Sequence, residues 1–298
     1  MGCDSRPPGA RRGMIQPVRK GQDLLREIDA ADARTPTFWW LGQSGFVVKY
    51  HQIVFYIDPY LSEQQTAKYR NTEQPRVRLM AAPLRGWQVR HADMILATHR
   101  HGTHLDAASI LSMLKGSRRA RLVLPKSAAG YANGQGIDYI RMTTTDEDLP
   151  IDFSKNGHQC RITPVASAHE SVDDQPLDGH PYLGYVIRFD DRWCVYHSGD
   201  CVPYPGLAVR LKAHRVDVAL LPINGRDPRR GTAGNFTVEE AAQLAEEIGA
   251  RWLVPMHYGM FAHDTVDVGR FVDHLLFSRP SQRFKVFEAG EKWAVPED

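Results

Sequence analysis

The feature that most constrains this chain is the segment HRHGTHLD at 99–106, which holds three histidines within six residues: His99, His101 and His104. It directly follows the apolar run ADMILAT at 92–98, which predicts a buried strand, and a helix is predicted at 106–115. Imidazole is the commonest metal ligand among side chains, and the end of a strand would bring these rings to one point. A chance cluster of surface histidines is the alternative, which the position at a strand end disfavours. The segment therefore predicts a metal site.

Three further residues occupy the same kind of position, directly after a predicted strand: His169, Asp200 and His257. His169 and Asp200 follow the runs at 161–167 and 192–198, and His257 ends the run at 251–257. Each alone would suit a hydrogen-bonded loop residue. Open α/β sheets, however, build their sites at strand ends, and five histidines with one aspartate are enough for up to two metal ions.

The remaining pattern is that of an α/β protein. Strand-like runs are predicted at 38–50 (two strands around a turn), 53–58, 120–125, 182–189, 216–223 and 283–289. Helices are predicted at 20–31, 126–133, 237–249 and 265–276, the third with Thr237 and Glu240 as a capping box. Because no repeat or linker separates the halves, we expect a single domain over 14–298, preceded by a disordered tail at 1–13.

Charge and composition limit the kinds of binding partner that we expect. The formal net charge is +2, which argues for neither a nucleic-acid nor a membrane partner, and no run of 18 apolar residues is present. The start lacks the apolar stretch of a secretory signal, so we expect a cytoplasmic protein with reduced thiols. A small-molecule substrate is the expected partner, and a homo-oligomer remains open.

The order of these motifs resembles the metallo-β-lactamase fold superfamily from about residue 36 to the end. Within it, WWLGQSGF, HRHGTHLD, YHSGD, INGRD and GNFT look most like the lactonases that open L-ascorbate-6-phosphate. The resemblance implies a four-layer αβ/βα sandwich with zinc or manganese at one edge, manganese being associated with the lactonase branch.

The resemblance also implies roles for individual residues. His99, His101 and His169 would hold a first metal ion, His104 and His257 a second, and Asp200 would bridge both. Asp58 and Asp106 would orient imidazoles from behind, although Asp58 would equally suit a turn before Pro59. A metal-bound hydroxide would attack the substrate, so that Asp200, His257 and Asp106 form the expected catalytic set.

One position departs from the family pattern. Thr103 stands where the family has an aspartate that ligates the second metal. Since a neutral hydroxyl is a poor ligand, we expect one firmly bound ion and a weak second site.

The basic loop at 222–237 suggested phosphate contacts by Arg226, Arg229 and Arg230. Further pocket candidates are Asn235, Tyr204 and His263 with its neighbour Asp264. A lactonase acting on a small sugar-acid lactone, phosphorylated or not, is the favoured hypothesis. The alternatives are a phosphodiesterase of the same fold, acting on phospholipid or nucleic acid, and a metal-binding protein impaired in catalysis by Thr103.

Overall fold

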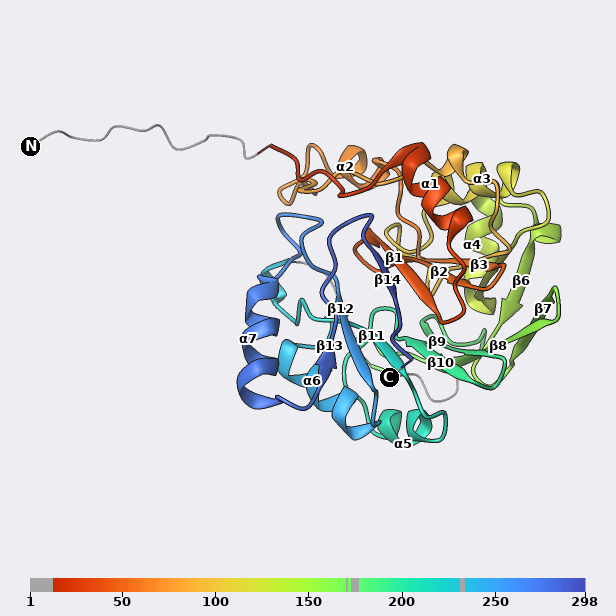
Figure 1. The fold of residues 1–298 in the computed structure, drawn as a ribbon. Coiled ribbons are helices and arrows are strands. Elements are labelled where there is room, and N and C mark those ends of the chain that lie inside the picture. Colours follow the sequence, from red (N-terminus) through yellow and green to blue (C-terminus); the bar gives the residue numbers. More distant parts are fainter. Residues whose placement is uncertain (1–12, 170, 173–176, 231–233, 298) are drawn as a thin grey trace, which may run out of the picture.

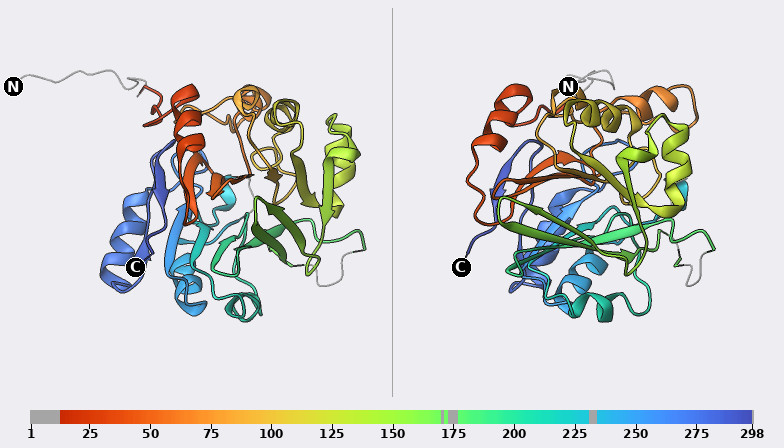
Figure 2. Two further views of the ribbon diagram at one scale, coloured as in Figure 1. Left: turned by 45° about the vertical axis from the view of Figure 1, so that its right-hand side comes forward. Right: turned by 90° about the vertical axis from the view of Figure 1, so that its right-hand side faces the viewer.

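The computed structural model describes residues 13–169, 171–172, 177–230 and 234–297. Of the predicted tail at 1–13, only Gly13 belongs to this part; residues 1–12 lie outside it. Two seven-stranded sheets face each other, and helices cover their outer faces (Figures 1 and 2). The predicted αβ/βα sandwich is therefore confirmed. Among the described residues, no helix has the length and apolar character needed to cross a membrane.

The first sheet has the order β14-β1-β2-β3-β4-β5-β6. Its strands are β1 (Thr37–Gly42), β2 (Gly45–Tyr50), β3 (Ile53–Ile57), β4 (Met94–Leu96), β5 (Arg121–Pro125), β6 (Met142–Thr145) and β14 (Lys292–Ala294). The helices of this half are α1 (Gly21–Ala30), α2 (Gln64–Lys68), α3 (Ala107–Gly116) and α4 (Ala129–Gly134), with short 3-10 turns at 86–88, 126–128 and 139–141. Apolar residues of α1, α3 and α4 pack in one core with the sheet.

The second sheet has the order β13-β12-β11-β10-β9-β8-β7. Its strands are β7 (Ile151–Lys155), β8 (His158–Ala166), β9 (Leu183–Phe189), β10 (Trp193–His197), β11 (Val218–Pro222), β12 (Trp252–Met256) and β13 (Arg283–Phe284). The helices are α5 (Leu207–Lys212), α6 (Val238–Glu247) and α7 (Val268–Ser278), with a 3-10 turn at 228–230. The predicted capping box of Thr237 and Glu240 starts α6.

Some elements differ from the sequence-based prediction. The elements β6, β7, β14 and α5 were not predicted, because they are short and β6 and β7 are largely polar. The strand predicted at 283–289 is formed only over its first two residues. The Lys285 N–H still donates to the Leu253 carbonyl of β12, whereas the Phe287 N–H donates to the Tyr258 hydroxyl, 3.0 Å away, instead of to a neighbouring strand.

The two sheets join at one edge. The backbone N–H of Leu183, in β9, donates to the Thr98 carbonyl, which follows β4. The Tyr185 hydroxyl donates to the Ala97 carbonyl at 2.8 Å, so both contacts tie the sheets together. Strands β3, β4, β8, β10 and β12 all end at this edge, where their loops gather the predicted metal ligands.

Candidate metal centre

The structure brings all six predicted ligands together in two groups that share Asp200. The first group is His99, His101, His169 and Asp200, and the second is His104, Asp200 and His257. Within each group, one ligand atom from every residue lies within 4.8 Å of the others. Apart from His101, which is exposed, these side chains are buried.

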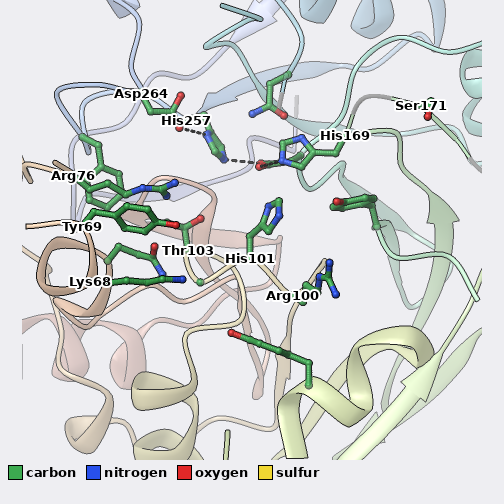
Figure 3. A pocket seen from close by; sticks show the side chains of 17 residues that line it. Lys68, Tyr69, Arg76, Arg100, His101, Thr103, His169, Ser171, His257 and Asp264 are labelled. Carbon is green, nitrogen blue, oxygen red and sulfur yellow. Dashed lines mark ion pairs between the residues drawn. The ribbon is translucent and has the colours of Figure 1, made fainter. Parts of the chain in front are cut away.

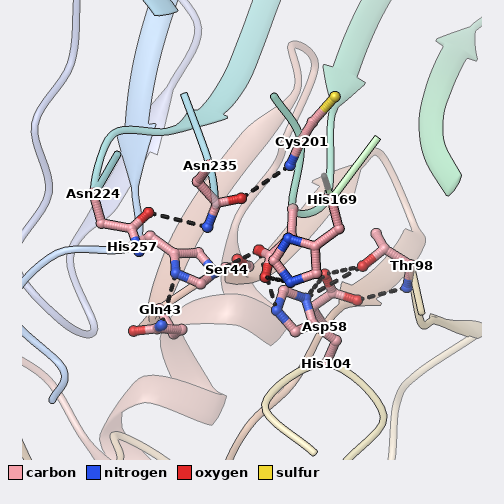
Figure 4. A network of polar contacts seen from close by, with 12 residues as sticks. Gln43, Ser44, Asp58, Thr98, His104, His169, Cys201, Asn224, Asn235 and His257 are labelled. Carbon is pink, nitrogen blue, oxygen red and sulfur yellow. Dashed lines mark hydrogen bonds and ion pairs between the residues drawn. The ribbon is translucent and has the colours of Figure 1, made fainter. Parts of the chain in front are cut away.

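Asp200 belongs to both groups and presents one carboxylate oxygen to each. Figure 4 shows the side chains of His104, His169 and His257 gathered at this place. Its Oδ2 lies 3.3 Å from Nε2 of His169 and 3.9 Å from Nε2 of His99. Its Oδ1 lies 3.3 Å from Nε2 of His104 and 2.6 Å from Nε2 of His257. This is the arrangement in which one carboxylate can bridge two cations.

Buried polar atoms at the centre fit a bound cation. Although Nε2 of His104 and of His257 lie close to Oδ1 of Asp200, these three atoms and Nε2 of His99 make no hydrogen bond of suitable geometry within the described part of the chain. An unsatisfied buried polar group costs about 1–3 kcal/mol. Divalent ions accept imidazole nitrogen and carboxylate oxygen as ligands, so the donor set fits one or two of them.

Asp58 orients two of the histidines from behind. Its carboxylate accepts hydrogen bonds from Nδ1 of His104 at 2.6 Å and from the Thr98 hydroxyl at 2.7 Å. Because the Thr98 hydroxyl has donated its proton to Asp58, its oxygen accepts from Nδ1 of His99, 3.1 Å away. With the proton on Nδ1, each ring keeps the Nε2 lone pair for a metal.

His169 and His257 are held in the same way. Nδ1 of His169 donates to the Gly234 carbonyl at 2.9 Å. Nδ1 of His257 lies 2.8 Å from the side-chain amide of Gln43, in the β1–β2 turn. A half-turn of that amide places its oxygen Oε1, which has no other partner in the described chain, against the Nδ1 proton of a metal-bound His257.

The backbone of three of these residues is left-handed: φ is +53° at Gln43, +45° at Asp58 and +63° at His257. Non-glycine residues in this region cost of order 1–3 kcal/mol each, and such residues cluster at functional sites. At these three residues the left-handed conformation turns the backbone sharply after the ends of β1, β3 and β12.

Asp106 does not orient an imidazole, contrary to the prediction. Its carboxylate accepts hydrogen bonds from the backbone of Leu61 and Ser62 and from the hydroxyls of Ser62 and Ser109. Because residue 106 begins α3, its side chain faces the loop that follows β3 and fastens that loop to the helix. Of the two aspartates considered, Asp58 alone contacts a ligand.

His197, to which the sequence assigned no ligand role, has both ring nitrogens engaged. Its Nδ1 accepts from the Gly199 N–H at 3.1 Å, and its Nε2 donates to the Ser44 carbonyl at 2.8 Å. It is fully buried and connects β10 to the β1–β2 turn. Its contacts therefore support the loop that carries Asp200.

The electrostatics of the site favour neutral rings at His99 and His101, an ionised Asp200 and a protonated His104. Burial, together with the neighbouring His104, holds the pKa of His99 well below its usual value, and burial with His169 lowers the pKa of His101 to about 4. Burial opposes ionisation of Asp200, but His104 and His257 outweigh it and hold its pKa well below the usual range. Burial also opposes protonation of His104, yet Asp200 and Asp58 raise its pKa to about 10. Those carboxylates would equally attract a cation at Nε2.

A pocket of about 630 Å³ opens onto the centre (Figure 3). Three cationic side chains line it, Lys68, Arg76 and Arg100, none of them singled out from the sequence. Lys68 and Arg76 lie in the long segment between β3 and β4, which has no periodic sequence pattern, and Arg100 lies inside the histidine motif. Its volume falls within the range of small-molecule sites, roughly 300–1,000 Å³.

Of the predicted substrate residues, the structure places Asn235 and Asp264 on this pocket. Asn235 also accepts from the Cys201 N–H at 2.9 Å and donates to Asn224 at 3.0 Å, which fixes the chain next to Asp200. Asn224 in turn donates to Asp264 at 2.7 Å.

Tyr204, Arg226 and His263 do not line this pocket, in contrast to the expectation. The Tyr204 hydroxyl donates to the Ala166 carbonyl at 2.6 Å and borders a separate hollow beside α5 and α6. Arg226 pairs with Glu240, which caps α6. His263 lines a neighbouring depression with Arg76.

The other two arginines of the basic loop, expected to meet phosphate, are also engaged by protein groups. Arg229 pairs with Asp227 at 2.9 Å, and Arg230 donates to the Asn224 carbonyl at 2.6 Å. The loop residues 231–233 lie outside the described residues.

Comparison with known proteins agrees with this centre. The beta-lactamase superfamily domain matches residues 54–258. The UPF0173 metal-dependent hydrolase of Methanopyrus kandleri is 31% identical over 232 residues, covering 74% of this chain and 84% of that protein. That of Pyrococcus horikoshii is 27% identical over 237 residues, covering 78% and 88%. Among solved structures, the isothiocyanate hydrolase from Delia radicum gut bacteria superposes with a TM-score of 0.69 at 17% identity, covering 87% of this chain and 99% of that one, which shows the shared fold.

The chain therefore belongs to the metallo-β-lactamase superfamily. Within it, the chain is a member of the UPF0173 metal-dependent hydrolases.

The role of Asp58 yields a first prediction. Asp58→Asn is expected to weaken metal binding about 10–100-fold. The Asp58 carboxylate accepts three hydrogen bonds, two from Thr98 and one from His104, whereas an asparagine amide has only one acceptor oxygen. Metal affinity would be measured by competition with a chelating dye.

Asp106→Asn is the matched control, since Asp106 is equally buried and contacts no imidazole. It is expected to lower the melting temperature and leave the metal affinity unchanged. Equal loss of affinity in both variants would contradict the role given to Asp58.

Proposed function

We propose that the protein hydrolyses the ester bond of a small anionic lactone, a sugar-acid lactone with or without a phosphate group. The observation that carries the proposal is that a two-group His/Asp centre opens into a pocket of small-molecule size with three cationic side chains on its wall. The resemblance of the sequence motifs to ascorbate-6-phosphate lactonases supports the substrate class.

Zinc and manganese are the proposed ions, since both accept mixed imidazole and carboxylate ligands. A bound divalent ion supplies hydroxide near neutral pH and polarises the carbonyl of the substrate. The chain contributes the fixed ring orientations of its histidines and the ionised, bridging position of Asp200.

The side chains next to Asp200 support this metal-dependent route. The Ser198 hydroxyl donates to the Gly199 carbonyl at 2.7 Å, and the Cys201 thiol donates to the Val202 carbonyl at 3.3 Å. Both are fully buried, and burial raises the pKa of Cys201 to about 12. Neither is placed as a nucleophile.

A substrate panel tests the proposal. Anionic lactones, neutral lactones, phosphodiesters and phosphomonoesters would be assayed with Mn²⁺ and with Zn²⁺. We expect kcat/KM to be highest for an anionic lactone and to disappear when the metal is chelated. Preferred hydrolysis of a phosphodiester would favour the alternative activity, and no hydrolysis with tightly bound metal would favour a non-catalytic metal protein.

A further inference from the structure

We propose that an oxyanion carried by the substrate, a carboxylate or a phosphate, supplies the negative charge that Thr103 lacks at the second metal group, and that Lys68 and Arg76 hold it there. The proposal rests on the proposed function in taking the anion to belong to the substrate. The anion site itself is defined by residues of this chain and can be tested without turnover.

Lys68 and Arg76 form a cationic wall on one side of the pocket. The Arg76 guanidinium carbon lies 4.2 Å from the centre of the Tyr69 ring, and the Lys68 Nζ lies 5.3 Å from it. No ion pair of either side chain exists within the described ranges, although nearby Arg78 pairs with Glu63 at 3.1 Å. Two cations thus contact one aromatic ring, and neither of them forms an ion pair in the part of the chain that the structure describes.

This wall borders the side of the pocket where Thr103 stands. Figure 3 shows Lys68, Tyr69 and Arg76 grouped together, with the Tyr69 side chain reaching toward Thr103. Thr103 lines the same pocket and is 7% exposed. An anion placed against the wall would therefore lie beside the position of the absent carboxylate.

The charges of the metal ligands leave a positive excess at this place. Asp200 is the single carboxylate in the two ligand groups. Two divalent ions with one aspartate and one hydroxide would leave a formal charge of roughly +2, against roughly +1 with the usual second aspartate. The lysine and arginine of the wall add to this excess, so an oxyanion is the ligand that the pocket best accommodates.

Other pocket side chains do not supply the charge. Asp264 accepts from Asn224 at 2.7 Å, lies 3.6 Å from Arg230, and faces Nδ1 of His257, the ring nitrogen turned away from the metal position. Gln65 is neutral, and its amide fills the space beside Gly102, where an added Cβ would come within 1.9 Å of its nitrogen.

The Arg76 guanidinium is suited to hold an oxyanion. Its contact with the Tyr69 ring restrains the side chain, and a guanidinium edge can donate two parallel hydrogen bonds to a carboxylate or phosphate. Lysine adds a mobile charge to the same group. One oxyanion would thus be shared between this wall and a cation that His104, Asp200 and His257 would hold.

The test counts bound Mn²⁺ on the metal-free full chain, by electron paramagnetic resonance of free Mn²⁺. Titrations would be run with inorganic phosphate and with sodium chloride of equal ionic strength. We expect one firmly bound ion per chain in chloride, and a second ion in phosphate whose affinity is at least about tenfold higher than in chloride.

Variants of the wall residues test where phosphate acts on binding of the second ion. Arg76→Ala and Lys68→Ala, alone and combined, should keep the first ion and lose the effect of phosphate on the second. Arg229→Ala is the control, because Arg229 is exposed, pairs with Asp227 and does not line the pocket. Retention of the first ion reports that each variant is folded.

Two firmly bound ions without phosphate would overturn the proposal, as would a single ion in both salts. A phosphate effect that survives in the combined variant would also overturn it. These outcomes involve no substrate, so they are distinguishable from failure of the lactone panel, which would leave the metal and phosphate titrations unchanged.

Discussion

His101→Ala and His169→Ala are each expected to abolish hydrolysis and to release the first metal ion. Both rings belong to the ligand group that holds three histidines and Asp200. Loss of a group that only supports a ligand commonly costs 10–100-fold in metal affinity, so loss of a ligand should cost about 100-fold or more. Elemental analysis after dialysis and the rate on the best lactone of the panel would measure both effects.

His197→Ala is the informative comparison within the same prediction. His197 is as buried as the ligands but has its two nitrogens bonded to Gly199 and Ser44. Its loss should lower the free energy of unfolding by about 2–4 kcal/mol while the ion and most of the rate remain. His214→Ala, at a partly exposed position outside both ligand groups, controls for removal of any imidazole. Equal loss of metal in all four variants would show that the ligand assignment is wrong.

The ligand set could be predicted from the sequence because it is encoded locally. A buried apolar run ending in a histidine or aspartate places that side chain at a sheet edge, whatever the order of the strands. His99, Asp200 and His257 follow this rule after β4, β10 and β12. The α6 capping box was predictable for the same reason, since both of its residues lie within one turn.

Strand register decides which residues lie behind the ligands, and the register cannot be read from the sequence. Asp58 reaches His104 because β3 pairs with β4 in parallel, with Ile57 opposite Leu96, and this register sets Asp58 beside Thr98. Asp106 is nearer to His104 in sequence but begins a helix that turns its carboxylate away. Both aspartates were expected to orient imidazoles, and the strand pairing selects Asp58.

The pocket wall was harder still to predict. Lys68, Tyr69 and Arg76 come from a segment without hydrophobic periodicity, and the contact of both cations with one ring is seen only in the folded chain. The basic loop at 222–237 was a clearer sequence signal, yet its arginines pair with Glu240, Asp227 and the Asn224 carbonyl. A run of charge indicates a substrate contact only when its counter-charges are absent from the fold.

Thr103→Asp is expected to make binding of the second metal ion strong and independent of phosphate. The new carboxylate would stand next to His104 and give the second cation both a bond and a Coulomb partner. Its affinity for Mn²⁺ without phosphate should rise about tenfold or more, the reverse of losing a ligand. The measurement is the same Mn²⁺ titration in chloride and in phosphate.

The effect of Thr103→Asp on catalysis distinguishes a second metal site that is only weakened from one that the substrate completes with its own negative charge. If Thr103 only weakens the site, Thr103→Asp raises the rate on every lactone, because a second cation can share the work of supplying hydroxide and stabilising the oxyanion. If the substrate supplies the missing charge, the new carboxylate competes with it for the wall of Lys68 and Arg76. We therefore expect kcat/KM to fall for anionic lactones and to rise for neutral ones, since Thr and Asp are similar in size and the change is mainly one of charge. A rise for both classes would contradict the substrate-supplied anion, and an unchanged metal stoichiometry in chloride would contradict the placement of residue 103 at the second ion.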